Sequence, residues 1–517
     1  MQNQRKKVSY LQKTTFRTDT FSRIYLVTML CIFPLFLAAE KYITLTSAKA
    51  TFFYIVTGLY LLSIPMLRLT RFEGSGKQKP WKPNFTVAEW AMLAFLFFCI
   101  VSAIFSPYPK YTFWGIKERN DGLMTALMYG GAFFMVSRYY KPRRLDFLLF
   151  AGSAALVSVI AILQYFNMDL FRLFPYDRLP EYTPQTIIFR TTLGNIDFIS
   201  AYTSLTMPFF GILYVKSEGK SRFIYLAAGM LCTVLMVLAG AEAGMVGALA
   251  AFVISVPFIL TDGRSITRTA FLGFAYCISI FSFKLAAKAS EGTAIHDMLG
   301  SRWLLLSFVL LFISAAVYFI YPHIHFHMTR RTVRIIGTAI MVLIILSGFA
   351  FVEIVGRSPD MGTVYQAREM MHGTMKDEFG TYRGYVWNCS IDLLKERTPV
   401  GQLLFGSGPD TFVNRFRPFR SETIDLLGKN YDKAHNEYLQ ILFCEGIFGL
   451  VAYLVFLFSV CRKAVARAFD DPLVLAAGLG SVAYMAQAFF SISAPIVTPL
   501  FFLLLALTAL RSAPAED

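Results

Sequence analysis

The residue of this chain that is best placed for acid–base chemistry is His435. It stands at the junction between the polar residues 354–434 and an apolar run that reaches Val460. A membrane helix is therefore expected to meet water at this residue. An unperturbed imidazole has a pKa of about 6.5, so it can accept and release a proton near neutral pH. The position of His435 predicts a reactive side chain at a membrane surface.

Two glycines share the predicted helix face of His435. If residues 435–449 form one helix, His435, Gly446 and Gly449 fall on one stripe. Glycines on such a stripe let a neighbouring helix approach closely, so we expect the imidazole to be held against a packed neighbour. Glu445 lies inside the same apolar run. Inserting a carboxylate there costs about 2.5 to 3.5 kcal/mol, so it is expected to face the bundle interior.

Arginines beside apolar residues are candidates for binding phosphate. Arg190 is flanked by apolar residues ahead of a predicted span, and Arg119 lies in the aromatic and glycine-containing segment 111–122. The planar guanidinium fork matches the oxygens of a phosphate or pyrophosphate. A salt bridge to Asp177 or Glu181 is an equally open interpretation for Arg190. The segment around Arg119 is suited both to stacking on a sugar and to binding its phosphate.

Three alternating histidines, His323, His325 and His327, have a spacing that can place metal ligands on one face of a strand. They stand beside Arg330 and Arg331, and we interpret them as residues of the membrane interface. The long loops between predicted spans contain no Asp-x-Asp pair that could hold magnesium through carboxylates. Neither a metal nor another cofactor is expected.

Composition places the chain among membrane proteins. Hydrophobic residues make up 56% of its 517 residues and charged residues 16%, which is too apolar for a soluble protein. The formal net charge of +16 comes from Lys and Arg that lie between apolar runs. The positive-inside bias of membrane proteins accounts for this charge better than nucleic-acid binding does. The seven Cys imply no disulfide framework.

The apolar runs predict about fourteen membrane spans. They are expected near residues 24–42, 48–67, 87–106, 122–138, 145–166, 196–215, 222–240, 243–260, 268–286, 301–321, 333–353, 435–460, 472–491 and 495–510. Clusters of Lys and Arg fall in alternate connections, which places these connections and both termini in the cytoplasm. The opposite, extracytoplasmic side then carries the long loops, where function is expected.

Three parts follow from this pattern. Residues 1–353 form an N-terminal transmembrane bundle of about eleven spans, 354–434 a large extracytoplasmic loop, and 435–517 three C-terminal spans. The loop mixes aromatic residues, turn signals and helical stretches, unlike a disordered tether. We therefore expect it to fold onto the membrane face as short helices, which gives an all-α polytopic membrane protein with one large extracytoplasmic loop domain.

Residues 435–449 contain His-Asn, nine further residues and then Gly-x-x-Gly. This pattern looks like the signature of the bacterial O-antigen ligase and O-antigen polymerase superfamily. Two further stretches are similar to the same superfamily and occur in the same order: 190–195 before a predicted span, and 383–387 followed by 405–409 in the large loop. Residues 240–244 stand where many members carry a Ser-Arg pair, so the role of that arginine is not carried over.

The resemblance implies a metal-independent, inverting glycosyltransferase with a GT-C-like bundle in the bacterial cytoplasmic membrane. Its donor would be a glycan on undecaprenyl pyrophosphate, and its acceptor a hydroxyl of a glycan, lipid or protein. On this interpretation His435 accepts the proton of the acceptor hydroxyl, while Arg190 and Arg383 grip the pyrophosphate. Supporting residues are expected to be Arg119, Asn436, Glu437 and Asn195.

Two other classes remain open on the residues alone. A transporter of a small anion or sugar can also use arginines, but its site is expected near the membrane midplane, whereas the polar motifs of this chain gather at one surface. A peptidoglycan-type glycosyltransferase of the shape and division family usually relies on a loop aspartate, for which Asp410 and Asp432 are candidates. The residues do not separate a ligase from a polymerase, because both use the same type of donor.

Overall fold

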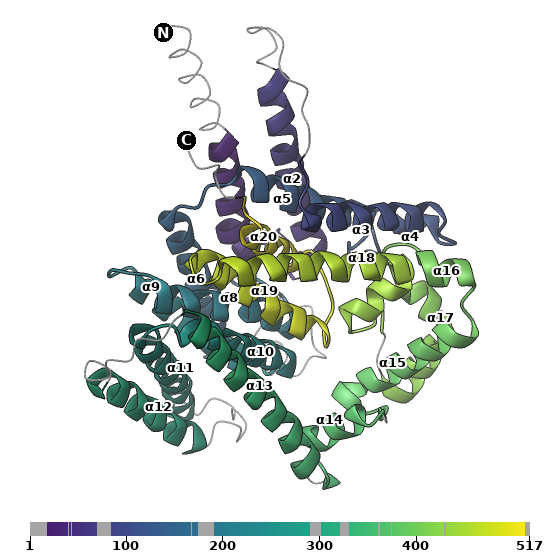
Figure 1. Ribbon diagram of the computed structural model, residues 1–517. Helices are drawn as coiled ribbons and strands as arrows, with labels where there is room; N and C mark the ends of the chain where they lie inside the picture. The colour runs from purple at the N-terminus through teal and green to yellow at the C-terminus, as the bar shows by residue number, and fades with distance from the viewer. Residues whose placement is uncertain are drawn as a thin grey trace, which may run out of the picture.

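The computed structural model describes residues 18–39, 41–42, 44–69, 84–166, 168–173, 191–289, 301–320, 330–359, 362–373, 375–428 and 431–511. Within these ranges the chain consists of helices joined by turns and loops and contains no strand. Figure 1 shows the helices as one assembly that runs from purple at the N-terminus to yellow at the C-terminus. The expectation of an all-helical fold is confirmed.

The order of the helices follows the apolar runs of the sequence. Residues 18–35 are helical and include η1 (Thr28–Ile32) and η2 (Phe33–Leu35). The next helices are α2 (Leu45–Leu69), α3 (Val87–Ile104), α4 (Pro109–Thr112), α5 (Leu123–Tyr139), α6 (Arg144–Tyr165), α8 (Ile196–Lys216), α9 (Arg222–Ala239), α10 (Glu242–Ile259), α11 (Gly263–Ala289), α12 (Ser301–Ile320) and α13 (Arg330–Val355). The C-terminal helices are α18 (Glu437–Arg467), α19 (Pro472–Ala488) and α20 (Thr498–Thr508).

A helix lies in each region where the sequence predicted a span. Among the residues described, nine helices are long and apolar enough to cross a membrane. α19, α20 and the Val309–Ile320 part of α12 are apolar but shorter. These helices agree with a polytopic membrane protein, because only helices and closed barrels satisfy their backbone hydrogen bonds in lipid. The count of fourteen spans remains a prediction.

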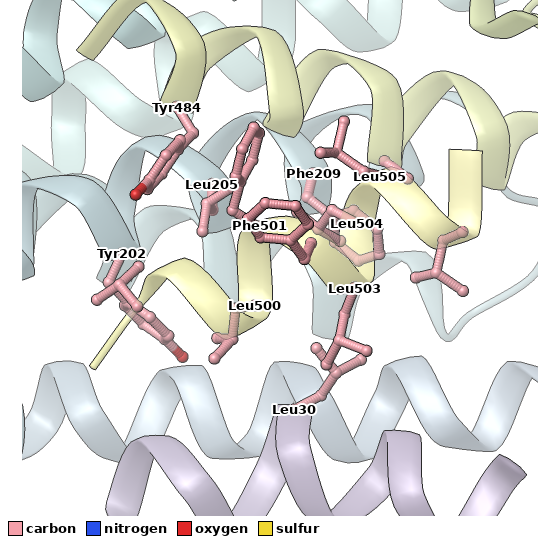
Figure 2. Close-up of a cluster of buried hydrophobic side chains, with 14 of the residues drawn as sticks. Leu30, Tyr202, Leu205, Phe209, Tyr484, Leu500, Phe501, Leu503, Leu504 and Leu505 are labelled. Carbon is pink, nitrogen blue, oxygen red and sulfur yellow. The ribbon is translucent and has the colours of Figure 1, made fainter. Parts of the chain in front are cut away.

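Two buried helices form the centre of the bundle. α8 is buried on most of its circumference, and its hydroxyls donate to its own carbonyls, for example Thr203 Oγ1 to Ile199 O at 2.9 Å. α20 is buried along its whole length and packs against α5 and α19. Figure 2 shows Phe501 of α20 near Tyr484 of α19, and these rings stack with centroids 4.2 Å apart. The N-terminal bundle and the C-terminal helices therefore share one core.

Residues 354–434 were predicted to form short helices, and their described parts do so. The helices are α14 (Thr363–Met371), α15 (Phe379–Glu396), α16 (Val400–Phe405) and α17 (Phe412–Leu427). Figure 1 shows them, in green, between the end of α13 and the start of α18. They have a core of their own, which Trp387 and Phe412 form with Phe443 of α18. The segment is folded against α18, while its extracytoplasmic position remains a prediction.

The expectation of one continuous helical stripe from His435 to Gly449 is wrong. α18 breaks at Gly446, whose φ of 74° and ψ of −176° are not helical. Glycine has no Cβ and adopts this conformation readily. A Cβ on Gly446 would lie 2.4 Å from Leu404 O at the end of α16. Gly446 therefore admits the backbone at the end of α16, so the predicted close approach of another helix occurs at this glycine although the stripe itself is broken.

The glycine-containing turn 406–408 replaces the hydrogen bonds that α18 loses at this break. The backbone N–H of Ser407 donates to Phe443 O at 3.1 Å, and that of Gly408 donates to Cys444 O at 2.9 Å. Buried carbonyl groups without such partners are costly. These two backbone hydrogen bonds fix the turn to α18. They also attach the segment 354–434, to which the turn belongs, to the helix that follows His435.

Candidate functional site

His435 lies just before α18 and not within it. Asn436 is the N-cap of α18, and its Oδ1 accepts a hydrogen bond from Leu439 N at 3.0 Å. Because this cap fixes Glu437 as the first helical residue, the span predicted to begin at His435 starts too early. His435 has a φ of 50°. Such a left-handed conformation is uncommon for residues other than glycine and is concentrated at functional sites.

The backbone beside His435 is held from two helices. Ala434 N donates to Gln440 Oε1 of α18 at 3.0 Å, and Ala434 O accepts from Trp387 Nε1 of α15 at 2.9 Å. The ring of Tyr431 meets the imidazole edge to face, with centroids 5.5 Å apart. The imidazole is half-buried. Its left-handed backbone is therefore maintained by contacts on both sides.

Arg383 approaches the same region from α15. Its Nη2 lies 3.5 Å from Oδ1 of Asp197 in the first turn of α8. Asn195 caps that helix, because its Oδ1 accepts from Asp197 N at 2.9 Å. Burial raises the pKa of Tyr431, and the positive charge of Arg383 opposes this rise. Arg383 is therefore close to Asp197 and to the ring that contacts His435.

Arg119 forms a second ion pair in this region. Its Nε and Nη2 donate to the two carboxylate oxygens of Asp432 at 2.7 and 3.0 Å, the two-point geometry that suits a guanidinium. Arg119 also interacts electrostatically with Asp197. The pair ties the loop that follows α4 to the segment before α18. We call the following group the histidine site: His435, Tyr431, Arg383, Asp197 and Arg119.

Lys433 forms a buried charge network beside the histidine site. Its side chain is 1% exposed, and its Nζ lies 2.5 Å from Asp121 Oδ2 and 3.4 Å from Asp410 Oδ1. Ser493 Oγ also donates to Asp121 Oδ2, at 2.6 Å. Burial alone would lower the pKa of Lys433, but the two carboxylates outweigh burial and raise it above its usual value. The charged ammonium joins segments that are distant in sequence.

Two glutamates of α18 face the interior of the bundle. Glu437 is buried and accepts hydrogen bonds from Tyr453 Oη at 2.6 Å and Tyr484 Oη at 3.4 Å. Glu445 is also buried, which confirms its expected inward orientation. Both line a cavity of about 60 Å³ together with Asp121. Across the described ranges, no three His, Cys, Asp or Glu side chains are arranged to hold a metal ion.

The structure brings together some of the side chains predicted for the site. His435 contacts Tyr431, on which Arg383 acts electrostatically, and Arg383 and Arg119 both act on Asp197. The side chains of Asn195 and Asn436 cap helices and so fix the backbone of the site. Glu437 anchors the start of α18 to tyrosines. The other predicted groups lie outside the described residues: Arg190, its candidate partners Asp177 and Glu181, and the histidines His323, His325 and His327.

The sequence analysis did not single out Asp197, Tyr431 or Lys433. A usable signal existed for two of them, because Asp197 follows the motif residue Asn195 closely and Lys433 shortly precedes His435. A charged group beside a membrane span needs a partner, so both could have been expected to pair. Nothing in the sequence marked Tyr431, since an aromatic residue in a loop has no pattern of its own.

Comparison with known proteins identifies the part of the chain that carries most of the histidine site. Residues 297–454 match the family model described as O-Antigen ligase. This match confirms the resemblance to the O-antigen ligase and polymerase superfamily and supports glycan transfer of that general type. It includes α15 with Arg383 and the segment from Tyr431 to His435. No curated protein sequence matches the chain.

Proposed function

We propose that this chain, which carries the O-Antigen ligase region at residues 297–454, transfers a glycan from undecaprenyl pyrophosphate to an acceptor hydroxyl. The acceptor belongs to a glycan, a lipid or a protein. The reaction takes place on the extracytoplasmic face of the bacterial cytoplasmic membrane, and both termini lie in the cytoplasm. It inverts the anomeric carbon and uses no metal.

One observation carries this proposal: a half-buried imidazole packs against an aromatic ring on which a nearby guanidinium acts electrostatically. Tyr431 contacts His435 at 5.5 Å between ring centroids, and it lies within the electrostatic influence of Arg383. An imidazole is the side chain most often used as a general base. A guanidinium neutralises phosphate oxygens. These are the two functions that a pyrophosphate-linked sugar requires of an enzyme, since its leaving group is already good.

The reaction proceeds as a single displacement. The acceptor oxygen attacks the anomeric carbon, and its proton passes to the imidazole of His435. The bond from the anomeric carbon to the phosphate oxygen breaks, and both electrons leave with the undecaprenyl pyrophosphate. Arg383, with Arg190, stabilises the negative charge that develops on the leaving group. Attack from the side opposite to the leaving group inverts the configuration at carbon.

The two arginines of the histidine site differ in their availability to phosphate. Arg119 is held by two short contacts to Asp432, of 2.7 and 3.0 Å, whereas Arg383 lies 3.5 Å from Asp197. The looser pair exchanges its carboxylate for a phosphate more readily. We therefore assign the pyrophosphate to Arg383 and assign Arg119 to positioning the segment that precedes His435.

The loop aspartates that would serve a peptidoglycan-type transferase are engaged elsewhere. Asp410 is buried, lies 3.4 Å from Lys433 and accepts from Ile116 N at 2.8 Å. Asp432 is bound by Arg119. Both carboxylates are thus occupied by cations, and Asp410 also accepts a backbone N–H, so neither is free to take the proton of an acceptor hydroxyl. His435 is therefore the base that the geometry favours.

The test is glycan transfer by purified protein in proteoliposomes that contain lipid-linked glycan from the source cell. General-base catalysis contributes about 10² to 10⁴ in rate, so the His435→Ala variant should lose that factor. His372→Ala is the matched control, because His372 follows the end of α14 and pairs there with Glu353 of α13 at 2.7 Å, away from the histidine site. Its rate should equal that of the unaltered protein.

Two results would count against the proposal. Equal product formation by His435→Ala and the unaltered protein would remove His435 from the chemistry. Uptake of a small anion or sugar into the vesicles, without any glycan transfer, would favour a transporter. Assays that contain one type of acceptor at a time then distinguish a ligase from a polymerase. A polymerase uses another copy of its own glycan as the acceptor, whereas a ligase uses a different acceptor.

A further inference from the structure

A large cavity lies at the opposite end of α8 from the histidine site. It has a volume of about 910 Å³ and is lined by residues of α8, α9, α11 and α12. The histidine site contacts α8 at Asp197, near its start, whereas this cavity reaches Tyr214, near its end. Arg222, Arg264 and Arg268 also line it, and we call it the basic cavity.

The three arginines share a single carboxylate. Arg268 Nη2 lies 3.2 and 3.1 Å from the two oxygens of Glu218, and Arg264 and Arg222 also act on Glu218 electrostatically. Lys216 and Asp262 lie beside this cluster and pair with each other at 3.9 Å, while Arg144 donates to the backbone carbonyl of Glu218 at 3.5 Å and adds further positive charge. The cavity therefore has an excess of positive charge.

Two of the guanidinium groups keep free donors. Nε of Arg222 is buried and has no hydrogen-bond partner among the described residues, although its guanidinium lies 4.9 Å from the ring centroid of Phe223. Arg264 is exposed and makes no hydrogen bond or ion pair with the part of the chain described here. A buried donor without a partner costs free energy, so an acceptor at this position would stabilise the structure.

The remaining wall of the basic cavity is apolar. Phe271 of α11 lines it together with Leu311, Val317 and Phe319 of α12, and these two helices pack against each other. A free inorganic anion has no apolar surface to bury against this wall. A molecule with a phosphate at one end and a hydrocarbon chain at the other fits both parts of the cavity.

We propose that the basic cavity binds an anionic phospholipid. Its phosphate lies between Arg222 and Arg264, and an acyl chain extends along α11 and α12. The alternation of charge places these arginines on the cytoplasmic side, where anionic lipids give the membrane its negative surface potential and where basic pockets between helices bind their headgroups. The lipid would fill the space between α11, α12 and the bundle and hold these helices in place.

The experiment measures retained lipid by native mass spectrometry of the full-length protein, after incubation with phosphatidylglycerol or phosphatidylcholine. Phosphatidylglycerol should bind at least about tenfold more tightly than phosphatidylcholine. One basic residue near the membrane contributes a factor of about five, so the double variant Arg222→Gln with Arg264→Gln should weaken phosphatidylglycerol binding about thirtyfold. Arg462→Gln, an exposed residue of α18, should leave the binding unchanged.

The outcomes separate the proposal from its rivals. Equal binding of the two lipids, or an unaltered affinity in the double variant, would overturn it. Displacement of phosphatidylglycerol by inorganic phosphate at similar concentration would overturn it in favour of a free anion. If the double variant unfolds, the single change Arg264→Gln decides the question. Arg264 is exposed and makes no hydrogen bond or ion pair with the described residues, so this variant should stay folded and its affinity for phosphatidylglycerol should fall about fivefold.

Discussion

The histidine site and the basic cavity both contain several arginines, but they differ in how far carboxylates neutralise the positive charge. In the histidine site, Arg383 and Arg119 are each paired with a carboxylate, at 3.5 and 2.7 Å. In the basic cavity, three guanidinium groups share Glu218. The first arrangement fixes arginines in position at nearly neutral local charge. The arrangement in the basic cavity leaves a net positive charge that a bound anion would neutralise.

This difference predicts which region tolerates the loss of a cation. Removing one partner from a buried ion pair leaves an uncompensated charge and is strongly destabilising. Removing a cation from an already positive, partly exposed cluster relieves repulsion and costs little. Cations around the histidine site should therefore matter for folding and for chemistry. Those of the basic cavity should matter for binding alone.

The largest effect is expected for Lys433→Met. This change leaves the buried carboxylate of Asp410 and the largely buried one of Asp121 without their ammonium, which lies 3.4 and 2.5 Å from them. The free energy of unfolding should fall by about 3 to 5 kcal/mol, measured by thermal or denaturant unfolding in detergent. The added change Asp121→Asn should recover part of the loss. A single variant as stable as the unaltered protein would show that the network does not hold these loops.

A smaller effect, on rate and not on folding, is expected for Arg383→Lys. An ammonium keeps the charge but lacks the planar fork. Loss of a charge-assisted hydrogen bond costs about 1.5 to 3 kcal/mol, so transfer should slow roughly 10- to 100-fold in initial-rate measurements. Arg417→Lys is the control, because Arg417 is exposed on α17. If both variants transfer glycan at the same rate, Arg383 does not grip the pyrophosphate.

The smallest effect is expected for Arg264→Gln in the basic cavity. Because this side chain is exposed and has no ion pair among the described residues, the free energy of unfolding of the lipid-free protein should change by less than about 0.5 kcal/mol. The same unfolding measurement as for Lys433→Met makes the two regions directly comparable. If Arg264→Gln lowered the free energy of unfolding as much as Lys433→Met does, the proposed difference between the two regions would be wrong.

The helices were predictable because their signal is local. Each apolar run coincides with a helix, from α2 to α20, since a segment in lipid must satisfy its backbone hydrogen bonds within itself. The cap at Asn436 is also a local feature, because its partner is Leu439 N three residues further on. The break at Gly446 was not predictable, because it depends on the end of α16 and the turn that follows it, which come from a distant part of the sequence.

The site was predictable in its residue types but not in its partners. His435 stood out because a lone histidine precedes an apolar run, and Arg383 stood out because residues 383–387 resemble a stretch of the O-antigen ligase and polymerase superfamily. Their surroundings did not stand out: Lys433 and Asp121 are 312 residues apart in the sequence. Arg383 and Asp197 lie on the different helices α15 and α8. No spacing rule connects such pairs.

The sequence by itself therefore determined that this chain is built of apolar helices and where its candidate base and cation lie. Hydrophobicity and side-chain chemistry act along the chain and can be read there. Only the tertiary structure decided which cations are neutralised and which are available for an anion. Coulomb interactions depend on distances in space and on burial, and neither quantity exists until the helices have packed.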